Sequence, residues 1–177
     1  MNKPKFNVKS IIVLTAICLI VAALLAVTNH FTSPVVEKTR QQKIVDSLKE
    51  VLPDMTKMEQ ITDLPEGTPS TVKSVYRIND DEYAIVLATT SAYSNGDMGI
   101  TVGMSKDGEI LGIKLTSYFE SKDFGRDTYP QYFVGKNSSD YADVDTFSGV
   151  TYSSKAFKKA LGDAFECFKL IGGGAAE

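Results

Sequence analysis

The sequence predicts an α+β domain, an antiparallel sheet packed by helices, preceded by one N-terminal transmembrane helix. Three observations predict it: a long apolar run near the N-terminus, alternating segments in the middle of the chain, and one amphipathic stripe near the C-terminus. A chain of 177 residues is long enough for one ordinary domain with an extension. The expected parts are 1–9 as a cytoplasmic N-terminus, 10–31 as the transmembrane helix, 32–70 as an approach helix and linker, 71–171 as the main domain and 172–177 as a flexible tail.

The apolar run predicts a membrane anchor. No Asp, Glu, Lys or Arg occurs from Ser10 to Val36. The stretch from Ile11 to Phe31 supplies the roughly 20 apolar residues that a membrane-spanning helix needs. A cleavable signal peptide has a shorter run and an A-x-A-like site, and the best candidate, Ala26, has the large Leu24 at the other small-residue position. We therefore expect a retained single-pass anchor, surrounded by membrane lipid.

Charge suggests the orientation of this anchor and the class of partner. Basic residues flank the span on both sides, so the positive-inside rule decides only weakly. Because Lys3, Lys5 and Lys9 precede the span, 16 of the 19 basic residues and all 22 acidic residues lie beyond it, a formal charge of −6. We expect the N-terminus in the cytoplasm and the main domain on the extracytoplasmic face of the cell (inner) membrane. An acidic domain argues against nucleic acid as a partner.

Four segments of the middle region predict a meander of strands. The expected strands are Thr71–Ile78, Tyr83–Ser91, Met98–Ser105 and Glu109–Tyr118. Asp107 and Gly108 supply a hairpin turn that tolerates positive φ. Before the strands, 55–70 is rich in proline and glycine and is expected to be a loop or linker.

Helices are predicted on either side of these strands. Apolar residues recur at helical spacing from Val35 to Leu52, and Pro53 ends the pattern. The segment from Ser153 to Ile171 carries an apolar stripe that includes Phe157 and Phe165, which we expect to pack in the core. The segment between the strands and this last helix is expected to be a loop with a short helix. Within it, Asn137 fits an N-glycosylation pattern, which a polar surface turn explains equally well.

Several kinds of chemistry are excluded by residue counts. His30 is the only histidine and sits at the membrane edge, so the main domain has no Cys/His zinc site, no Ser-His-Asp triad and no histidine for proton transfer. Cys18 lies in the span and Cys167 in the domain, so the two cysteines are not expected to form a disulfide with each other. We therefore expect no catalytic residue and no metal site of the chain's own.

Hydroxyl residues gather instead where the last helix begins, in DVDTFSGVTYSSKAF (Asp143–Phe157). A helix start offers unpaired N–H groups and a partial positive charge, which suit a phosphate. The first turn carries Lys155 and no acidic residue, which favours a bound anion. An ordinary N-cap by Thr151, Ser153 or Ser154 explains the hydroxyls without any ligand.

The residues from Asp145 to Thr151, D-x-x-S-G-V-T, resemble the flavinylation motif D-x-x-(S/T)-G-A-T. That motif occurs in the FMN-binding domain shared by the G subunit of the Rnf complex and the C subunit of the sodium-translocating NADH:quinone reductase. The resemblance extends over nearly the whole chain, including DGEILGIKL, and ESKDFG stands where the family usually has E-T-P-G-L-G. Val150 replaces the alanine of the motif. The short chain is more similar to the Rnf protein.

The resemblance implies a membrane-anchored electron carrier with covalent FMN. It implies that a phosphoester joins FMN to Thr151 and that a separate, metal-dependent flavin transferase recognises Asp145, Ser148, Gly149 and Thr151. A threonine hydroxyl is a poor nucleophile without a base or metal, so the chain is not expected to flavinylate itself. The residues implied around the phosphate are Ser148, Gly149, Val150, Ser154 and Lys155. Those implied beside the flavin are Glu120, Phe124 and Gly125.

The family setting implies the partners, and two alternatives stay open. The expected partners are the other membrane subunits of an ion-translocating ferredoxin:NAD+ oxidoreductase (Rnf) complex. The first alternative is an extracytoplasmic redox domain that binds FMN non-covalently, or a protein like the C subunit of the quinone reductase. The second is an anchored interaction domain without redox chemistry, in which the helix start is merely capped.

Overall fold

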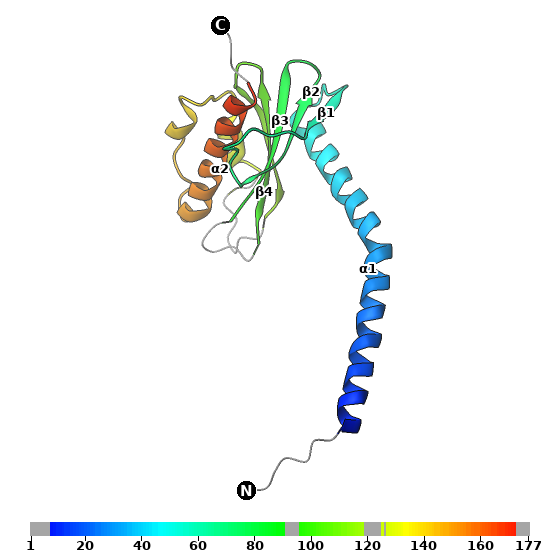
Figure 1. Cartoon of the computed structure of the whole chain (residues 1–177). Coiled ribbons are helices and arrows are strands. Elements are labelled where there is room, and N and C mark those ends of the chain that lie inside the picture. Colours follow the sequence, from blue (N-terminus) through cyan, green and yellow to red (C-terminus); the bar gives the residue numbers. More distant parts are fainter. Residues whose placement is uncertain (1–7, 91–95, 119–124, 126, 173–177) are drawn as a thin grey trace. The chain divides into compact units, whose positions relative to one another are not determined.

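The structure is a computed structural model that describes residues 8–90, 96–118, 125 and 127–172. The chain consists of two compact units, residues 1–43 and 44–177. The elements in chain order are α1 (Val8–Val51), β1 (Met58–Ile61), β2 (Val72–Ile78), β3 (Glu82–Thr89), β4 (Met98–Ser105), β5 (Ile110–Ser117), the 3-10 helices η1 (Tyr129–Phe133) and η2 (Tyr141–Asp143), and α2 (Thr151–Leu170) (Figure 1). The predicted α+β fold is confirmed, since a five-stranded antiparallel sheet with packed helices follows a long apolar helix.

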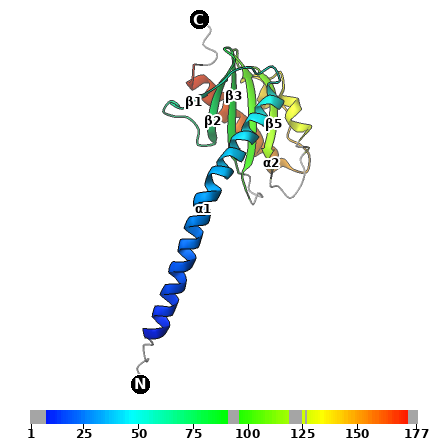
Figure 2. The same cartoon turned by 90° about the vertical axis from the view of Figure 1, so that its right-hand side faces the viewer.

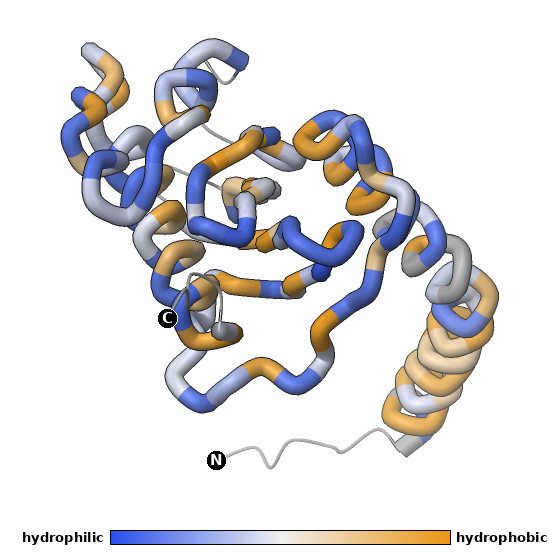
Figure 3. The backbone as a smooth tube through the Cα atoms, turned by 90° about the horizontal axis from the view of Figure 1, so that it is seen from above, coloured by the Kyte–Doolittle hydropathy of each residue, from blue (hydrophilic) through white to orange (hydrophobic). Residues whose placement is uncertain are grey.

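The first unit is the N-terminal part of α1. Ile11–Ser33 has a mean hydropathy of 3.0, and none of it is buried (Figure 3). Among the described residues, this is the one helix long and apolar enough to cross a membrane, as a single-pass anchor or a signal segment. The backbone stays helical through Pro34 to Val51, so the two helices predicted from the sequence are one continuous helix.

The sheet is an antiparallel meander with strand order β1-β2-β3-β4-β5. Four of these strands match the predicted ones within two residues at either end. The prediction of a loop throughout 55–70 was wrong, because Met58–Ile61 pairs with β2 as an edge strand. Asn79 explains this pairing: its side-chain Oδ1 accepts hydrogen bonds from the backbone N–H groups of Thr56 and Lys57, at 3.0 and 3.2 Å. A tertiary contact thus fixes a strand too short to show alternation.

Strand β4 shows how the sheet separates two layers of helix. Its buried residues at alternate positions, Met98, Ile100, Val102 and Met104, belong to the core cluster that includes the apolar stripe of α2. Phe157 and Phe165 lie in that cluster, as predicted. The last turns of α1 lie across the opposite face of the sheet (Figure 2).

Two glycines bring the end of α1 against this opposite face. A Cβ added to Gly103 would lie 2.6 Å from Val51 Cγ1, and a Cβ added to Gly112 would lie 2.7 Å from the backbone oxygen of Val51. Beside them, the buried hydroxyls of Ser47 and Thr101 lie 3.2 Å apart in a hydrogen bond. The second unit therefore includes the last turns of α1 as part of its packed structure.

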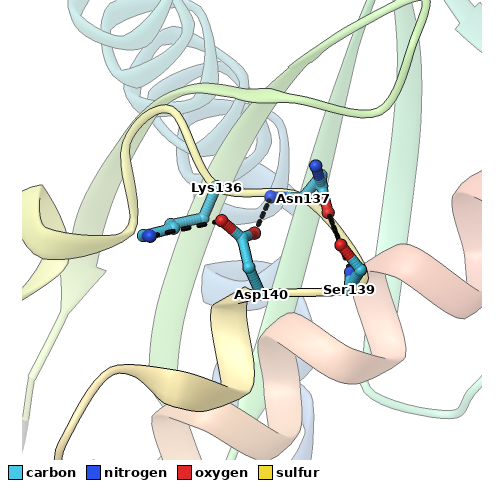
Figure 4. A network of polar contacts seen from close by, with 4 residues as sticks. All are labelled: Lys136, Asn137, Ser139 and Asp140. Carbon is cyan, nitrogen blue, oxygen red and sulfur yellow. Dashed lines mark hydrogen bonds and ion pairs between the residues drawn. The ribbon is translucent and has the colours of Figure 1, made fainter.

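The NSSD segment, which fits a glycosylation pattern, forms a polar turn (Figure 4). The side-chain oxygen of Asn137 accepts hydrogen bonds from the backbone N–H and hydroxyl of Ser139, at 2.8 and 2.6 Å. Asp140 accepts a hydrogen bond from the Asn137 N–H at 2.7 Å and pairs with Lys136 at 3.2 Å. These contacts give the segment a structural role as the turn before η2.

We expect the contribution of this turn to stability to depend on pH. The Asn137 N–H holds the pKa of the Asp140 carboxyl below its ordinary value of 3.8, with a smaller contribution from Lys136. A lowered pKa means that the stabilisation is present above pH 3.8 and is lost as the pH falls through the pKa in the folded state. Asp140→Asn should therefore lower the unfolding midpoint at pH 7 by a few degrees at most, because the Asp140 side chain is partly exposed to solvent. Thermal unfolding followed by circular dichroism measures this.

The exposed Asp143 supplies the matched control for this turn. Asp143→Asn should change the midpoint at pH 7 less than Asp140→Asn does. At a pH well below 3.8 the two variants and the parent should unfold alike. A difference at Asp140 that persisted in acid would mean that its carboxylate charge is not the cause.

Candidate functional site

The hydroxyl-rich segment forms an exposed loop at the start of α2. We call residues 145–150 the acceptor loop; it runs from the end of η2 to Thr151, the first residue of α2. Asp145, Ser148, Gly149 and Thr151 are all exposed. The four residues of the predicted recognition motif therefore lie together on the surface.

No side chain caps the start of α2. The N-cap residue is Val150, whose φ and ψ are −136° and 42°, and no side-chain hydrogen bond caps the helix. The interpretation of the hydroxyls as an ordinary N-cap was therefore wrong, because Thr151 lies inside the first turn and Ser153 and Ser154 are buried. The first turn carries no acidic side chain, as predicted, but Lys155 lies just beyond that turn and not in it, because α2 begins at Thr151; its side chain is exposed. This arrangement leaves the positive end of the helix dipole accessible to an anion.

The backbone turns sharply at Gly149. Its φ is +84°, in the left-handed region that glycine adopts without strain, and a Cβ placed there would meet nothing within 4 Å. The glycine is therefore needed for the shape of the acceptor loop, and the position of its missing side chain is open space.

Ser154 holds the acceptor loop through hydrogen bonds of its side chain. This residue is completely buried. Its hydroxyl accepts a hydrogen bond from the Phe147 N–H at 3.1 Å and donates one to the carbonyl of Val150 at 3.0 Å. The hydroxyl thus connects both halves of the loop, which the sequence did not predict.

Tyr129, on η1, contacts the beginning of the acceptor loop. Its hydroxyl donates a hydrogen bond to the carbonyl of Asp145 at 3.0 Å, and its ring is buried against Phe147 and Phe157. Burial raises the pKa of Tyr129 to about 12, with a smaller contribution in the same direction from Asp145 and an opposing one from a hydrogen bond with Ser154. The phenol is therefore neutral at physiological pH and acts as a hydrogen-bond donor rather than as a base.

Gly125 places the end of the predicted flavin loop beside the motif. Its φ is +70°, and an added Cβ would lie 3.4 Å from the ring of Phe147. The backbone N–H of Tyr129 donates to its carbonyl at 2.6 Å. Glu120 and Phe124, the other two predicted loop residues, lie outside the described residues. The structure thus brings at least one residue of that loop to the acceptor loop, although the two are far apart in sequence.

A surface pocket of about 430 Å³ opens between η1 and the acceptor loop. Its lining residues are Tyr129, Tyr132, Val144, Asp145, Thr146, Phe147 and Ser148. Sequence reasoning missed the aromatic residues among them. The available signal was the aromatic-rich YPQYF segment between two glycines, in which Tyr132 is exposed and offers a flat surface for a ring.

Lys158 and Lys155, both on α2, have different surroundings. Lys158 donates to the carbonyls of Ala142 and Val144, at 2.7 and 2.6 Å, and so ties η2 to the helix. Lys155 is exposed on the first part of the helix. Within the described part of the chain, no cluster of three or more His, Cys, Asp or Glu side chains could hold a metal ion. The exposed Lys155 offers a positive charge to an anionic ligand at this end of α2.

Comparison with protein-family models indicates which ligand this domain binds. Residues 94–166 match the FMN-binding domain family. These residues form an FMN-binding domain. The match covers β4, β5, both 3-10 helices, the acceptor loop and most of α2. The expected kinship is thereby confirmed at the level of the domain.

Curated proteins similar to most of the chain carry related names. The G subunit of the ion-translocating oxidoreductase complex of Shewanella baltica is 24% identical, over 89% of this chain and 87% of the relative. The corresponding protein of Vibrio atlanticus is 26% identical, over 81% of each chain. The G subunit of the proton-translocating ferredoxin:NAD(+) oxidoreductase complex of Clostridium ljungdahlii is 21% identical, over 91% of each chain. These similarities are distant, but they extend well beyond the FMN-binding domain.

The geometry of the FMN-binding domain fits an FMN molecule. Its phosphate suits the uncapped start of α2, where Ser148 and Lys155 are exposed and Gly149 leaves space. Its ring system suits a pocket walled by tyrosine and phenylalanine. Thr151 is the first residue of α2, three positions after the pocket residue Ser148, and its side chain is exposed.

Proposed function

We propose that this chain is a membrane-anchored electron-transfer protein, equivalent to the G subunit of an ion-translocating ferredoxin:NAD+ oxidoreductase (Rnf) complex, that carries FMN covalently on Thr151. The observation that carries the proposal is the motif from Asp145 to Thr151. It is exposed at an uncapped helix start within an FMN-binding domain. The names of the distant relatives support the assignment to such a complex.

In the attachment step, the Thr151 hydroxyl forms a phosphoester with the 5′-phosphate of the flavin. The donor is a flavin dinucleotide, because its pyrophosphate provides a leaving group. The new bond joins Thr151 Oγ to phosphorus, a P–O bond of the pyrophosphate breaks, and a nucleoside monophosphate leaves. The hydroxyl proton passes to a base of a separate flavin transferase, since the domain has no histidine. Asp145, Ser148 and Gly149 identify the site to that enzyme.

After attachment, the chain's residues hold and orient the cofactor. The start of α2 and the exposed residues Ser148, Gly149 and Lys155 receive the phosphate. The aromatic walls of the pocket face the ring, and Glu120, Phe124 and Gly125 are the further residues assigned to it. Bound FMN supplies one- and two-electron transfer, and the protein sets its position and potential. The domain therefore passes electrons between neighbouring subunits and needs no catalytic residue of its own.

The N-terminal helix anchors the protein in the cell (inner) membrane. A helix with the length and hydropathy of Ile11–Ser33 suits a single span. We infer that the N-terminus is cytoplasmic and that the FMN-binding domain is extracytoplasmic, beside the other membrane subunits of the complex. The acidic balance of the domain supports contact with proteins rather than with nucleic acid.

The test is whether flavin stays with the chain after denaturation. We expect the full chain, produced together with a flavin transferase, to give a fluorescent band on a denaturing gel. Its mass should be greater than that of the bare chain by one FMN less one water. Flavin that is released on denaturation would instead support non-covalent binding. A chain purified from its native membrane without any flavin would overturn the proposal.

A further inference from the structure

We propose that Ser154 and Tyr129 are positioning residues that fix the acceptor loop in the shape the flavin transferase acts on. This inference rests on the proposed function and goes beyond it, because neither residue belongs to the motif. In the structure the hydroxyl of each is hydrogen-bonded to the backbone of the loop. Both act through the backbone of the loop.

Ser154 is placed to control the centre of the loop. Its buried hydroxyl receives the Phe147 N–H and donates to the Val150 carbonyl, at 3.1 and 3.0 Å. The backbone N–H of Ser154 also donates to the Val150 carbonyl, at 3.1 Å. The three contacts fix the path of the chain over Ser148 and Gly149, the two motif residues that the contacts enclose. The Ser154 hydroxyl, which also forms a hydrogen bond with Tyr129, thus joins both halves of the loop to the helix.

Tyr129 fixes the end of the loop where the motif begins. Its hydroxyl donates to the carbonyl of Asp145 at 3.0 Å, and the residue is 1% exposed. Its ring cannot easily move, because the rings of Phe133 and Phe157 lie against it at 5.2 and 5.7 Å between centroids. The core of the domain therefore determines where the exposed Asp145 lies relative to Thr151.

The loop needs such support because its own interactions are few. Most of its residues are exposed, and Gly149 at φ +84° offers little resistance to other conformations. The helix start has no side-chain cap to hold it. A transferase that requires Asp145, Ser148 and Thr151 in one arrangement would find that arrangement less populated once Ser154 is lost. The apparent affinity for the chain falls in proportion to the competent fraction.

The experiment compares Ser154→Ala with Ser154→Thr, which keeps a hydroxyl, and with Ser153→Ala, the neighbouring buried serine. The full chain in detergent is treated with a flavin transferase and a flavin dinucleotide. The initial rate at which fluorescent flavin becomes covalently bound is measured over a range of chain concentrations. Ser154→Ala should lower the rate at limiting chain concentration by about tenfold. This is the range expected when one backbone group, the Phe147 N–H, loses its buried partner, since the Val150 carbonyl keeps the N–H of residue 154. Rates at saturating chain concentration should recover. Ser154→Thr should restore most of the loss, and Ser153→Ala should stay within about twofold of the parent.

A second readout reports on the loop without flavin. Hydrogen exchange of the Phe147 amide, measured by NMR on the unmodified full chain, should speed up in Ser154→Ala and remain slow in Ser153→Ala. Tyr129→Phe, which keeps the ring, should give a smaller loss of flavinylation rate in the same direction.

The possible negative results distinguish the positioning role from the proposed function. If the parent chain accepts flavin and Ser154→Ala accepts it equally fast, the positioning role is overturned. A slower rate with unchanged protection of the Phe147 amide, or an equal loss in Ser153→Ala, would also overturn it. If the parent chain accepts no flavin at all, the proposed function is overturned, while the exchange measurement still decides whether Ser154 holds the loop.

Discussion

Thr151→Val should carry no covalent flavin. Valine has nearly the same shape as threonine and keeps the first turn of α2, but it has no hydroxyl to form the phosphoester. The side chain is exposed, so the substitution removes little packing and the domain should remain folded. We expect complete loss of the fluorescent band on a denaturing gel, with unchanged circular dichroism. Thr151→Ser, which keeps a hydroxyl, should retain a reduced amount of covalent flavin.

The control for this prediction is an exposed threonine outside the site. Thr62→Val changes the same chemical group at a position remote in sequence from the motif and should leave the fluorescent band as it is. A fluorescent band in Thr151→Val would contradict the assignment, because the flavin would then be attached to another residue. Mass analysis of the labelled peptide would identify it, with Thr146 and Ser148 as the other threonine and serine hydroxyls of the acceptor loop.

Gly112→Val should strongly destabilise the second unit. At this position even one added carbon would lie 2.7 Å from the backbone oxygen and 3.3 Å from the Cα of Val51. Backbone cannot rotate away as a side chain can, so the end of α1 must leave the sheet or the strand must bend. Overpacking of a core costs typically 1–3 kcal/mol and sometimes more, and we expect about 3 kcal/mol here. The unfolding midpoint should fall by roughly 10 °C, measured by near-ultraviolet circular dichroism.

Two comparisons isolate the cause of this loss. Thr116→Val, on the exposed part of the same strand, should have little effect. Gly103→Ala should be destabilising because of the Val51 side chain, whose Cγ1 would lie 2.6 Å away. Adding Val51→Ala should therefore relieve Gly103→Ala in part, but should not relieve Gly112→Val. If Gly112→Val and Gly103→Ala both matched the parent, the close packing of α1 on this face would be contradicted.

The packing of α1 against Gly103 and Gly112 illustrates why one part of the fold could not be predicted. The sequence from Val35 to Leu52 indicates an amphipathic helix, and Gly103 and Gly112 stand in segments that read as strands. No local sequence pattern connects the helix with these glycines, because a glycine in a strand is equally consistent with a β-bulge or with a locally weakened strand. Only the packed structure reveals that these glycines make room for Val51.

Features that rest on local patterns could be predicted from the amino-acid sequence. These features are the apolar run, the four alternating segments and the stripe around Phe157. Each is a pattern of hydrophobic residues that follows directly from the geometry of helices and strands. The motif from Asp145 to Thr151 is likewise contiguous, so its residues are near one another in any fold. The strand Met58–Ile61, the tyrosine of η1 beneath Asp145 and the hydrogen bonds of the Ser154 side chain depend on residues far apart or on side-chain direction. Tertiary structure alone decided these, because hydrogen bonds across the core are chosen by packing and leave no period in the sequence.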